Sequence, residues 1–144
     1  MAISLPDGVK RLIDGRNFAH LATTMADGSP HSVPVWVGRE GDRIIISTEE
    51  TSVKAKNTQR DPRVAISMVD IADPYTLAQL RGRVVERRPD DVFQYTDPIS
   101  KKYIGEAWPL RDAKAVALFI EIDKAHYEKL PFEHANVGAA KKPA

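Results

Sequence analysis

Hydrophobic positions recur at two different spacings along this chain of 144 residues. Near the N-terminus, Val9, Leu12 and Ile13 follow the i, i+3, i+4 spacing of an amphipathic helix. A glycine then gives a C-terminal stop, so we predict a short helix over Pro6–Gly15. From Phe18 onward the apolar positions alternate with polar ones, which is typical of strands.

Strands are predicted over much of the remaining chain, separated by turns that contain glycine or proline. Asp27-Gly28 is a favoured hairpin pair. Pro34 lacks a donor for the sheet, which places its strand at an edge or at a bulge. The run Ile44–Ile46 indicates a strand buried on both faces, and Gly82 indicates a bulge within a long strand. The predicted strands are residues 18–24, 30–37, 43–48, 64–69, 75–87 and 116–123.

Two further helices are predicted between these strands. One covers Ser52 to Arg60, and Asp61-Pro62 ends it because the residue before a proline avoids helical geometry. The other covers Pro89 to Ile104. Strands joined by tight turns pair antiparallel, so about six strands with few helices predict a small closed or partly open barrel. We expect residues 1–137 to form one domain and residues 138–144 to be a disordered tail.

Composition narrows the functional classes. The chain is 42% hydrophobic and 28% charged, as in globular proteins, and its net charge of +1 favours neither nucleic acid nor an anionic membrane as a partner. It has no cysteine, which excludes disulfides, thiolate metal sites and cysteine nucleophiles. The spacing of its histidines matches no metal motif. Without an apolar leader or a bilayer-length apolar segment, we expect a cytoplasmic protein.

The segment from Ser47 to Arg63 gathers hydroxyl and cationic side chains where a strand gives way to a helix. Free amide N–H groups and the positive end of the helix dipole at this point favour an anion. Lys54 and Lys56 lie about 200° apart on a regular helix, so both cannot face one phosphate. An ordinary capped, basic surface helix has the same features, and charge and capping alone leave both interpretations open.

A second segment, Gly28 to Trp36, places polar residues and a tryptophan on one strand. A planar ring could lie against this strand, although an edge strand with one aromatic side chain in the core would look the same. Acidic pairs such as Glu49-Glu50 and Asp90-Asp91 are expected to be solvated turn residues. The sequence contains no glycine-rich phosphate loop and no serine nucleophile motif.

Taken in order, these segments resemble the pyridoxamine-phosphate-oxidase-like split barrels, and within them the deazaflavin (coenzyme F420)-dependent oxidoreductases. The resemblance covers about residues 10 to 88. It rests on Phe18-Ala-His-Leu-Ala-Thr-Thr, Asp27-Gly-Ser-Pro-His-Ser-Val-Pro-Val-Trp, the strand around Ile44, Lys54-Ala-Lys-Asn and Arg60-Asp-Pro-Arg. It implies a mainly β protein with flanking helices, a six-stranded antiparallel split β-barrel. It also implies a homodimer that holds its cofactor in the groove between the two barrels.

The resemblance further implies which positions bind the cofactor. They are Val33, Pro34, Val35, Trp36, Ser47, Thr48, Ser52, Lys54, Lys56, Asn57 and Tyr75. Ser52, Lys54, Lys56 and Asn57, on or next to the predicted helix, would hold the cofactor's phosphate and the start of the cofactor's tail. Ser47 and Thr48, at the end of the third predicted strand, would contact the ribityl chain or the phosphate. Residues 33–36 on the second predicted strand would line the ring. Tyr75 would reach across from the partner chain. No catalytic side chain is assigned, because a flavin or deazaflavin itself carries the hydride.

The function implied is an F420-dependent oxidoreductase that transfers a hydride between reduced deazaflavin and a small conjugated organic substrate. The alternatives are an FMN-dependent oxidase or reductase on the same fold and a non-catalytic flavin- or deazaflavin-binding protein. F420 is favoured because its oligoglutamate tail needs cations along an open groove. Lys54, Lys56, Arg60 and Arg63 could supply them.

Overall fold

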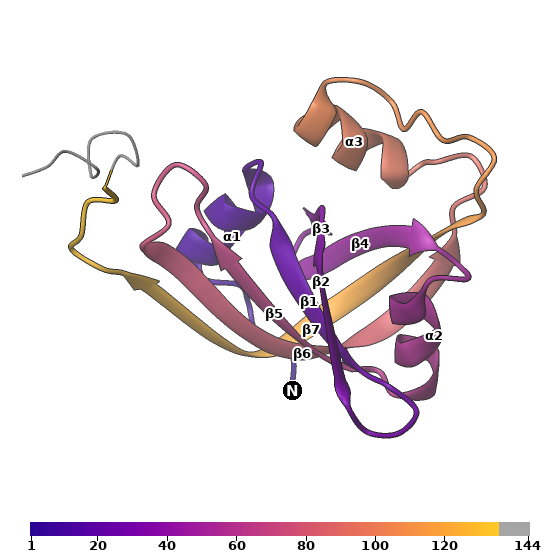
Figure 1. The fold of residues 1–144 in the computed structure, drawn as a ribbon, viewed down its shortest axis with the longest axis horizontal. Coiled ribbons are helices and arrows are strands. Elements are labelled where there is room, and N and C mark those ends of the chain that lie inside the picture. The colour runs from indigo at the N-terminus through magenta and orange to yellow at the C-terminus, as the bar shows by residue number, and fades with distance from the viewer. Residues whose placement is uncertain (136–144) are drawn as a thin grey trace, which may run out of the picture.

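The computed structural model describes residues 1–135, and the predicted tail at 138–144 lies outside them. Figure 1 shows a strongly curved sheet with α3 above β4 and α2 below it. No helix in the described part of the chain is long and apolar enough to cross a membrane. The elements are α1 (Asp7–Asp14), β1 (Ala19–Thr24), β2 (Pro30–Val35), β3 (Gly38–Glu40), β4 (Arg43–Glu49), α2 (Val53–Arg60), β5 (Arg63–Val69), β6 (Thr76–Pro89), α3 (Thr96–Ile104) and β7 (Ala115–Lys129).

The strands form one antiparallel sheet in the order β2-β1-β5-β6-β7-β4-β3. β2 and β3 lie at opposite ends of this order, yet only Trp36 and Val37 separate them in the chain. The sheet therefore has to curl until its two edges come close together. The predicted fold class, a mainly β antiparallel split barrel with flanking helices, is confirmed.

The predicted number of six strands is wrong, because the sheet has seven. The chain leaves β2 after Val35, where it paired with β1, and starts β3 at Gly38, where it pairs with β4. The predicted strand 30–37 thus ends two residues early, and β3, which follows the short crossing of Trp36 and Val37, was not predicted. Gly38 lies directly under α3, since a Cβ atom there would come within 2.9 Å of Ile99 Cγ1. The edge position predicted from Pro34 is confirmed, because β2 is an edge strand.

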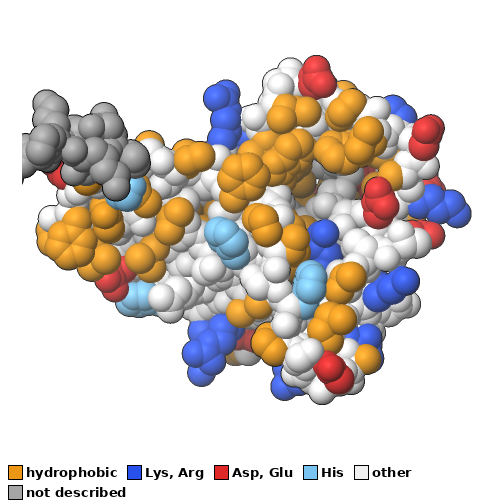
Figure 2. Space-filling model, viewed as in Figure 1, with side chains coloured by type: hydrophobic (Ala, Val, Ile, Leu, Met, Phe, Trp, Pro, Cys, Tyr) orange, Lys and Arg blue, Asp and Glu red, His pale blue; other side chains and the backbone are white. Residues whose placement is uncertain are grey.

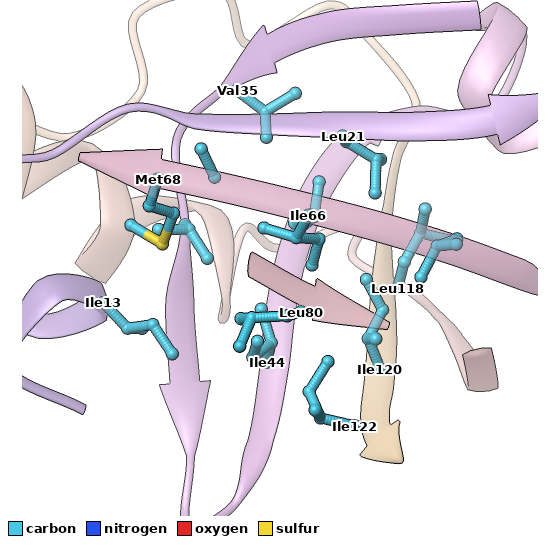
Figure 3. Packing of buried hydrophobic residues seen from close by; sticks show 14 of the residues in the cluster. Ile13, Leu21, Val35, Ile44, Ile66, Met68, Leu80, Leu118, Ile120 and Ile122 are labelled. Carbon is cyan, nitrogen blue, oxygen red and sulfur yellow. The ribbon is translucent and has the colours of Figure 1, made fainter. Parts of the chain in front are cut away.

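The core fills the inside of the curved sheet, and Figure 3 shows side chains from α1 and from most strands meeting there. The predicted apolar face of α1 is confirmed, with Val9, Leu12 and Ile13 fully buried. Ile44 and Ile46 enter this main core, whereas Ile45 joins a second cluster with Ile99, Ala117 and Phe119 on the other side of the sheet. The prediction that this strand is buried on both faces is therefore confirmed.

Two predicted boundaries near the C-terminal third are wrong. β7 runs to Lys129 and not to residue 123, because its alternation continues with the half-buried Ala125 and Tyr127 against the core. The predicted helix over 89–104 begins only at Thr96, because β6 remains paired with β7 as far as Pro89. Long β6 and β7 strands thus carry the chain from one end of the sheet to the base of α3.

The bulge predicted at Gly82 is confirmed by a register shift between Arg81 and Gly82. A Cβ atom at Gly82 would lie 1.9 Å from the backbone oxygen of Glu121, which a fixed backbone cannot relieve. We expect Gly82→Ala to lower the free energy of unfolding by about 3 kcal/mol or more, measured by urea denaturation. Arg83→Ala, an exposed neighbour on the same strand, is the control. A loss below about 1 kcal/mol for Gly82→Ala would contradict the close approach.

Candidate functional site

A cavity of about 330 Å³ lies beside the crossing from β2 to β3. The ends of β2 and β4, the first turn of α2, and α3 with the loop after it all contribute to its walls. Figure 2 shows the surface hollowed between the regions formed by α3 and α2, with hydrophobic side chains along the upper rim. The lining residues are Phe18, Pro34, Val35, Trp36, Ser47, Thr48, Glu49, Lys54, Thr96, Ile99, Trp108, Ala113 and Ala115.

Six of the eleven positions predicted to bind a cofactor line this one cavity. They are Pro34, Val35, Trp36, Ser47, Thr48 and Lys54. They come from three separate elements, which the curl of the sheet brings together. Val33 does not line the cavity and packs against the main core, on the same face of β2 as Val35 but farther from the end of the strand.

Ser52 and Asn57 hold α2 in place. Ser52 Oγ accepts hydrogen bonds from the backbone N–H of Ala55 at 3.2 Å and from Thr48 Oγ1 at 2.9 Å, so it is the N-cap of α2. Buried Asn57 donates from Nδ2 to Thr23 Oγ1 at 3.0 Å, which ties α2 to β1. Within one chain both side chains are bonded inside the protein and lie outside the cavity lining.

Tyr75 lies at the far end of the sheet from the cavity. It precedes β6, whose other end pairs with Val116 next to the cavity residue Ala115. Its hydroxyl is 3.0 Å from His134 Nδ1, and its ring meets Phe132 edge-on. The predicted contact of Tyr75 with a cofactor therefore requires a second chain.

The two lysines of α2 have different surroundings. Lys54 is half-buried in the cavity wall, whereas Lys56 is exposed, as their helical spacing predicts. Desolvation lowers the pKa of Lys54 below its ordinary value, and nearby Glu49 opposes this only in part. Within residues 1–135, no side chain lies close enough to the Lys54 ammonium to form a hydrogen bond or ion pair with it. The cavity therefore presents a partly desolvated cation.

The apolar wall of the cavity is aromatic, and among its aromatic side chains only Trp36 was a predicted binding residue. Trp36 stacks against Tyr103 with ring centroids 5.2 Å apart, and Trp108 meets Trp36 edge-on at 5.7 Å. Phe18 adds a third aromatic side chain, 46% exposed. The signal available in the sequence was a tryptophan in a loop, where aromatic side chains have no strand or helix face to bury them.

The loop that carries Trp108 is fixed to the start of α3. Asp97 Oδ1 accepts from the backbone N–H of Trp108 at 3.1 Å and from Arg111 Nη1 at 2.7 Å. The hydrogen bond from Arg111 is the main reason why the pKa of Asp97 is lowered. Trp108 is thus held over the cavity by a network that starts on the helix wall itself.

Asp90 is buried, with 2% of its surface exposed, so the prediction of a solvated turn residue is wrong for this position. Its carboxylate accepts from the backbone N–H groups of Tyr95 at 3.2 Å and Thr96 at 2.9 Å, which satisfies the free donors at the start of α3. It also accepts from Thr96 Oγ1 at 2.7 Å. Thr96 Oγ1 lies 2.5 Å from Ser47 Oγ, at the cavity wall.

Comparison with known proteins gives this arrangement a family. The family model described as pyridoxamine 5′-phosphate oxidase matches residues 5–129, which is most of the chain. The chain belongs to the pyridoxamine 5′-phosphate oxidase family. The resemblance to this family deduced from the sequence motifs is confirmed, and every residue that lines the cavity lies within the matched residues. A comparison with curated proteins found no match.

Several solved structures are similar to this member of the pyridoxamine 5′-phosphate oxidase family. An F420 reductase is 25% identical with a TM-score of 0.77, covering 85% of this chain and 98% of its own. A conserved hypothetical protein from Mycobacterium tuberculosis is 22% identical with a TM-score of 0.72, covering 96% of both chains. General stress protein 26 from Bacillus anthracis is 20% identical with a TM-score of 0.65, covering 84% of this chain and 91% of its own. The last two similarities concern the fold.

The cavity offers an organic ligand an aromatic wall, three hydroxyl side chains (Ser47, Thr48 and Thr96), the carboxylate of Glu49 and the cation of Lys54. Residues 1–135 contain no group of three or more histidine, aspartate or glutamate side chains arranged to hold a metal ion. Its volume is at the lower end of the range for ligand pockets in proteins. The arrangement suits a flat ring with a negatively charged group at one end.

Both tryptophans of the chain line the cavity or lie against its wall. We therefore expect a flavin or deazaflavin ring bound there to quench most of the intrinsic tryptophan fluorescence. Trp108→Phe should remove part of the quenched signal while the fold, measured by circular dichroism, is unchanged. If ligand binding leaves tryptophan emission unaltered in the wild-type protein, the ring does not bind in this cavity.

Proposed function

We propose that this cavity binds coenzyme F420 and that the protein is an F420-dependent oxidoreductase acting on a small conjugated organic substrate. The observation that carries the proposal is the half-buried Lys54 ammonium, which lines the cavity without a hydrogen-bonding or ion-pairing partner among residues 1–135. A partly desolvated cation is costly unless an anion compensates it. The cofactor phosphate would supply that anion.

The aromatic wall supports the ring end of the same ligand. Trp36, Trp108 and Ile99 give an apolar wall, and an aromatic face in such a wall can stack with a planar ring. Bound deazaflavin supplies the hydride. The chain's own residues orient the ring and exclude water from one of its faces. The other face stays available to a substrate, since the cavity is open.

The similarity to an F420 reductase supports F420 over FMN. The cationic groove predicted for the cofactor tail receives weaker support. Arg63 forms an ion pair with Asp61 at 2.7 Å, and Arg60 donates to the backbone oxygen of Thr24 at 2.8 Å. Lys56 is exposed beside them. An oligoglutamate tail would therefore meet Lys56 and Arg60, whose guanidinium is already partly hydrogen-bonded. FMN is the alternative cofactor.

A homodimer is part of the proposal. One chain leaves the cavity open, and it leaves Tyr75 at the far end of β6, away from the cavity. A second copy would bring its own Tyr75 to this cavity and cover the cofactor. The support is geometric, since the long β6 and β7 strands carry Tyr75 well clear of its own cavity.

Removal of the Lys54 cation should weaken binding. We expect Lys54→Ala to reduce F420 affinity by about 1 to 3 kcal/mol, the range for losing a charge-assisted hydrogen bond. The measurement is a fluorescence titration with F420, repeated with FMN. An unchanged affinity for both cofactors would show that the phosphate lies elsewhere.

Two other lysines make the test specific. Lys101→Ala removes an exposed lysine on α3 outside the cavity lining and should leave affinity unchanged. Lys56→Ala should cost less than Lys54→Ala, because Lys56 is exposed. A larger loss for Lys56→Ala would move the phosphate to the outer side of α2.

The affinity for F420 should also depend on pH. Burial lowers the pKa of Lys54 below its ordinary 10.5, so its ammonium loses a proton at a lower pH than an exposed lysine would. Only the charged form attracts the phosphate. We expect affinity to fall as the pH rises, at a lower pH than the loss of charge from an exposed lysine, and Lys54→Met to remove most of this fall. The same pH dependence in wild type and Lys54→Met would show that another group causes it.

A further inference from the structure

A chain of three polar side chains runs from the protein interior to the cavity wall. Buried Asp90 lies at one end, Thr96 in the middle and half-buried Ser47 at the cavity. The oxygen–oxygen distances are 2.7 Å from Thr96 Oγ1 to Asp90 Oδ2 and 2.5 Å from Ser47 Oγ to Thr96 Oγ1. The chain joins β4, α3 and the segment between β6 and α3, which no short-range motif in the sequence connects.

The chemistry of the three groups fixes the direction of these hydrogen bonds. A carboxylate can only accept, and two backbone N–H groups already point at Asp90. Thr96 has a single hydroxyl hydrogen, which it must give to Asp90. Thr96 Oγ1 therefore accepts from Ser47, whose only hydrogen is then used as well. Ser47 is left with lone pairs facing the cavity.

The geometry points to Ser47 as a hydrogen-bond acceptor for a hydroxyl group of the ligand's polyol chain, with Asp90 and Thr96 as positioning residues that impose this polarity. This inference rests on the proposed function, since both F420 and FMN carry a ribityl chain between ring and phosphate. It decides between the two contacts expected of Ser47 from the sequence, the ribityl chain and the phosphate.

A phosphate is a poor partner for such a group. Its oxygens are acceptors and need a donor, which Ser47 cannot offer while its hydrogen is bonded to Thr96. Thr48 is in the same condition, because its hydroxyl donates to Ser52 Oγ. The cavity lining therefore separates into acceptors at the end of β4 and the Lys54 cation on α2. A ligand with hydroxyls on one section and an anion on the next matches this division.

A series of three ligands tests the assignment by fluorescence titration. The first is F420. The second is its deazaflavin riboside, which keeps the ribityl hydroxyls and lacks the phosphate and tail. The third is the same ring with a methyl group in place of the ribityl chain. Ser47→Ala should weaken the binding of F420 and of the riboside by the same factor, about fivefold, and leave the binding of the methyl compound unchanged.

Substitutions at Thr96 test the positioning role. Thr96→Val removes the hydroxyl at nearly constant volume, which frees the Ser47 hydrogen and should weaken the riboside in the same sense as Ser47→Ala. Thr96→Ser keeps the hydrogen-bond chain and should restore wild-type affinity. Circular dichroism and thermal melting show which variants fold. If Thr96→Val does not fold, the result for Ser47→Ala alone decides the test.

The possible results separate this inference from the proposed function. If Ser47→Ala weakens F420 and leaves the riboside unchanged, Ser47 contacts the phosphate and the inference is overturned. If Ser47→Ala weakens the binding of the methyl compound by the same factor, Ser47 contacts the ring, and the inference is again overturned. In each case Lys54→Ala should still weaken the binding of F420 and leave the binding of the riboside unchanged, so the proposed function would still be supported. If the wild-type protein binds none of the three ligands, both proposals fail.

Discussion

The two-residue link between the edge strands is the constraint on which the rest of the molecule depends. Because only Trp36 and Val37 connect β2 to β3, a seven-stranded antiparallel sheet cannot stay open. The same link brings the end of β2 beside the end of β4, and the cavity lies there. The same two-residue link therefore closes the barrel and forms the cavity. Trp36 belongs to both, since it lies in the link and lines the cavity wall.

The second organising element is the buried carboxylate of Asp90. It satisfies the backbone donors at the start of α3 and so sets where the helix begins. Through Thr96 it also orients the hydroxyl of Ser47 on a different element. A single side chain therefore fixes the start of α3 and the polarity of the neighbouring hydroxyl on β4. Asp97, the second residue of α3, has a similar role, because it holds the loop bearing Trp108.

Local patterns were sufficient to predict most of the fold. Alternation revealed the strands, helical spacing revealed α1, and Gly82 revealed its bulge. The start of α3 was missed because it depends on the pairing of β6 with β7, which is distant in sequence. The short strand β3 and the burial of Asp90 depend on near neighbours, namely β4 and the N–H groups of Tyr95 and Thr96, but neither leaves an apolar pattern in the sequence. In the candidate site, the residues of β2 and β4 were predicted from the family resemblance, and the curl of the sheet brings them to one cavity. Ser52 and Asn57 are used to hold α2, and a motif cannot distinguish a capping hydroxyl from a ligand-binding one.

The two edges of the sheet also determine how this molecule can meet another copy of itself. β2 carries Pro30 and Pro34, which offer no N–H to an incoming strand, and β3 is only three residues long. Edges of this kind resist the strand-to-strand pairing that leads to ordered aggregates. An association between two copies is therefore expected to use side chains and not strand pairing at these edges. Such an association would leave the backbone hydrogen bonds of each sheet intact.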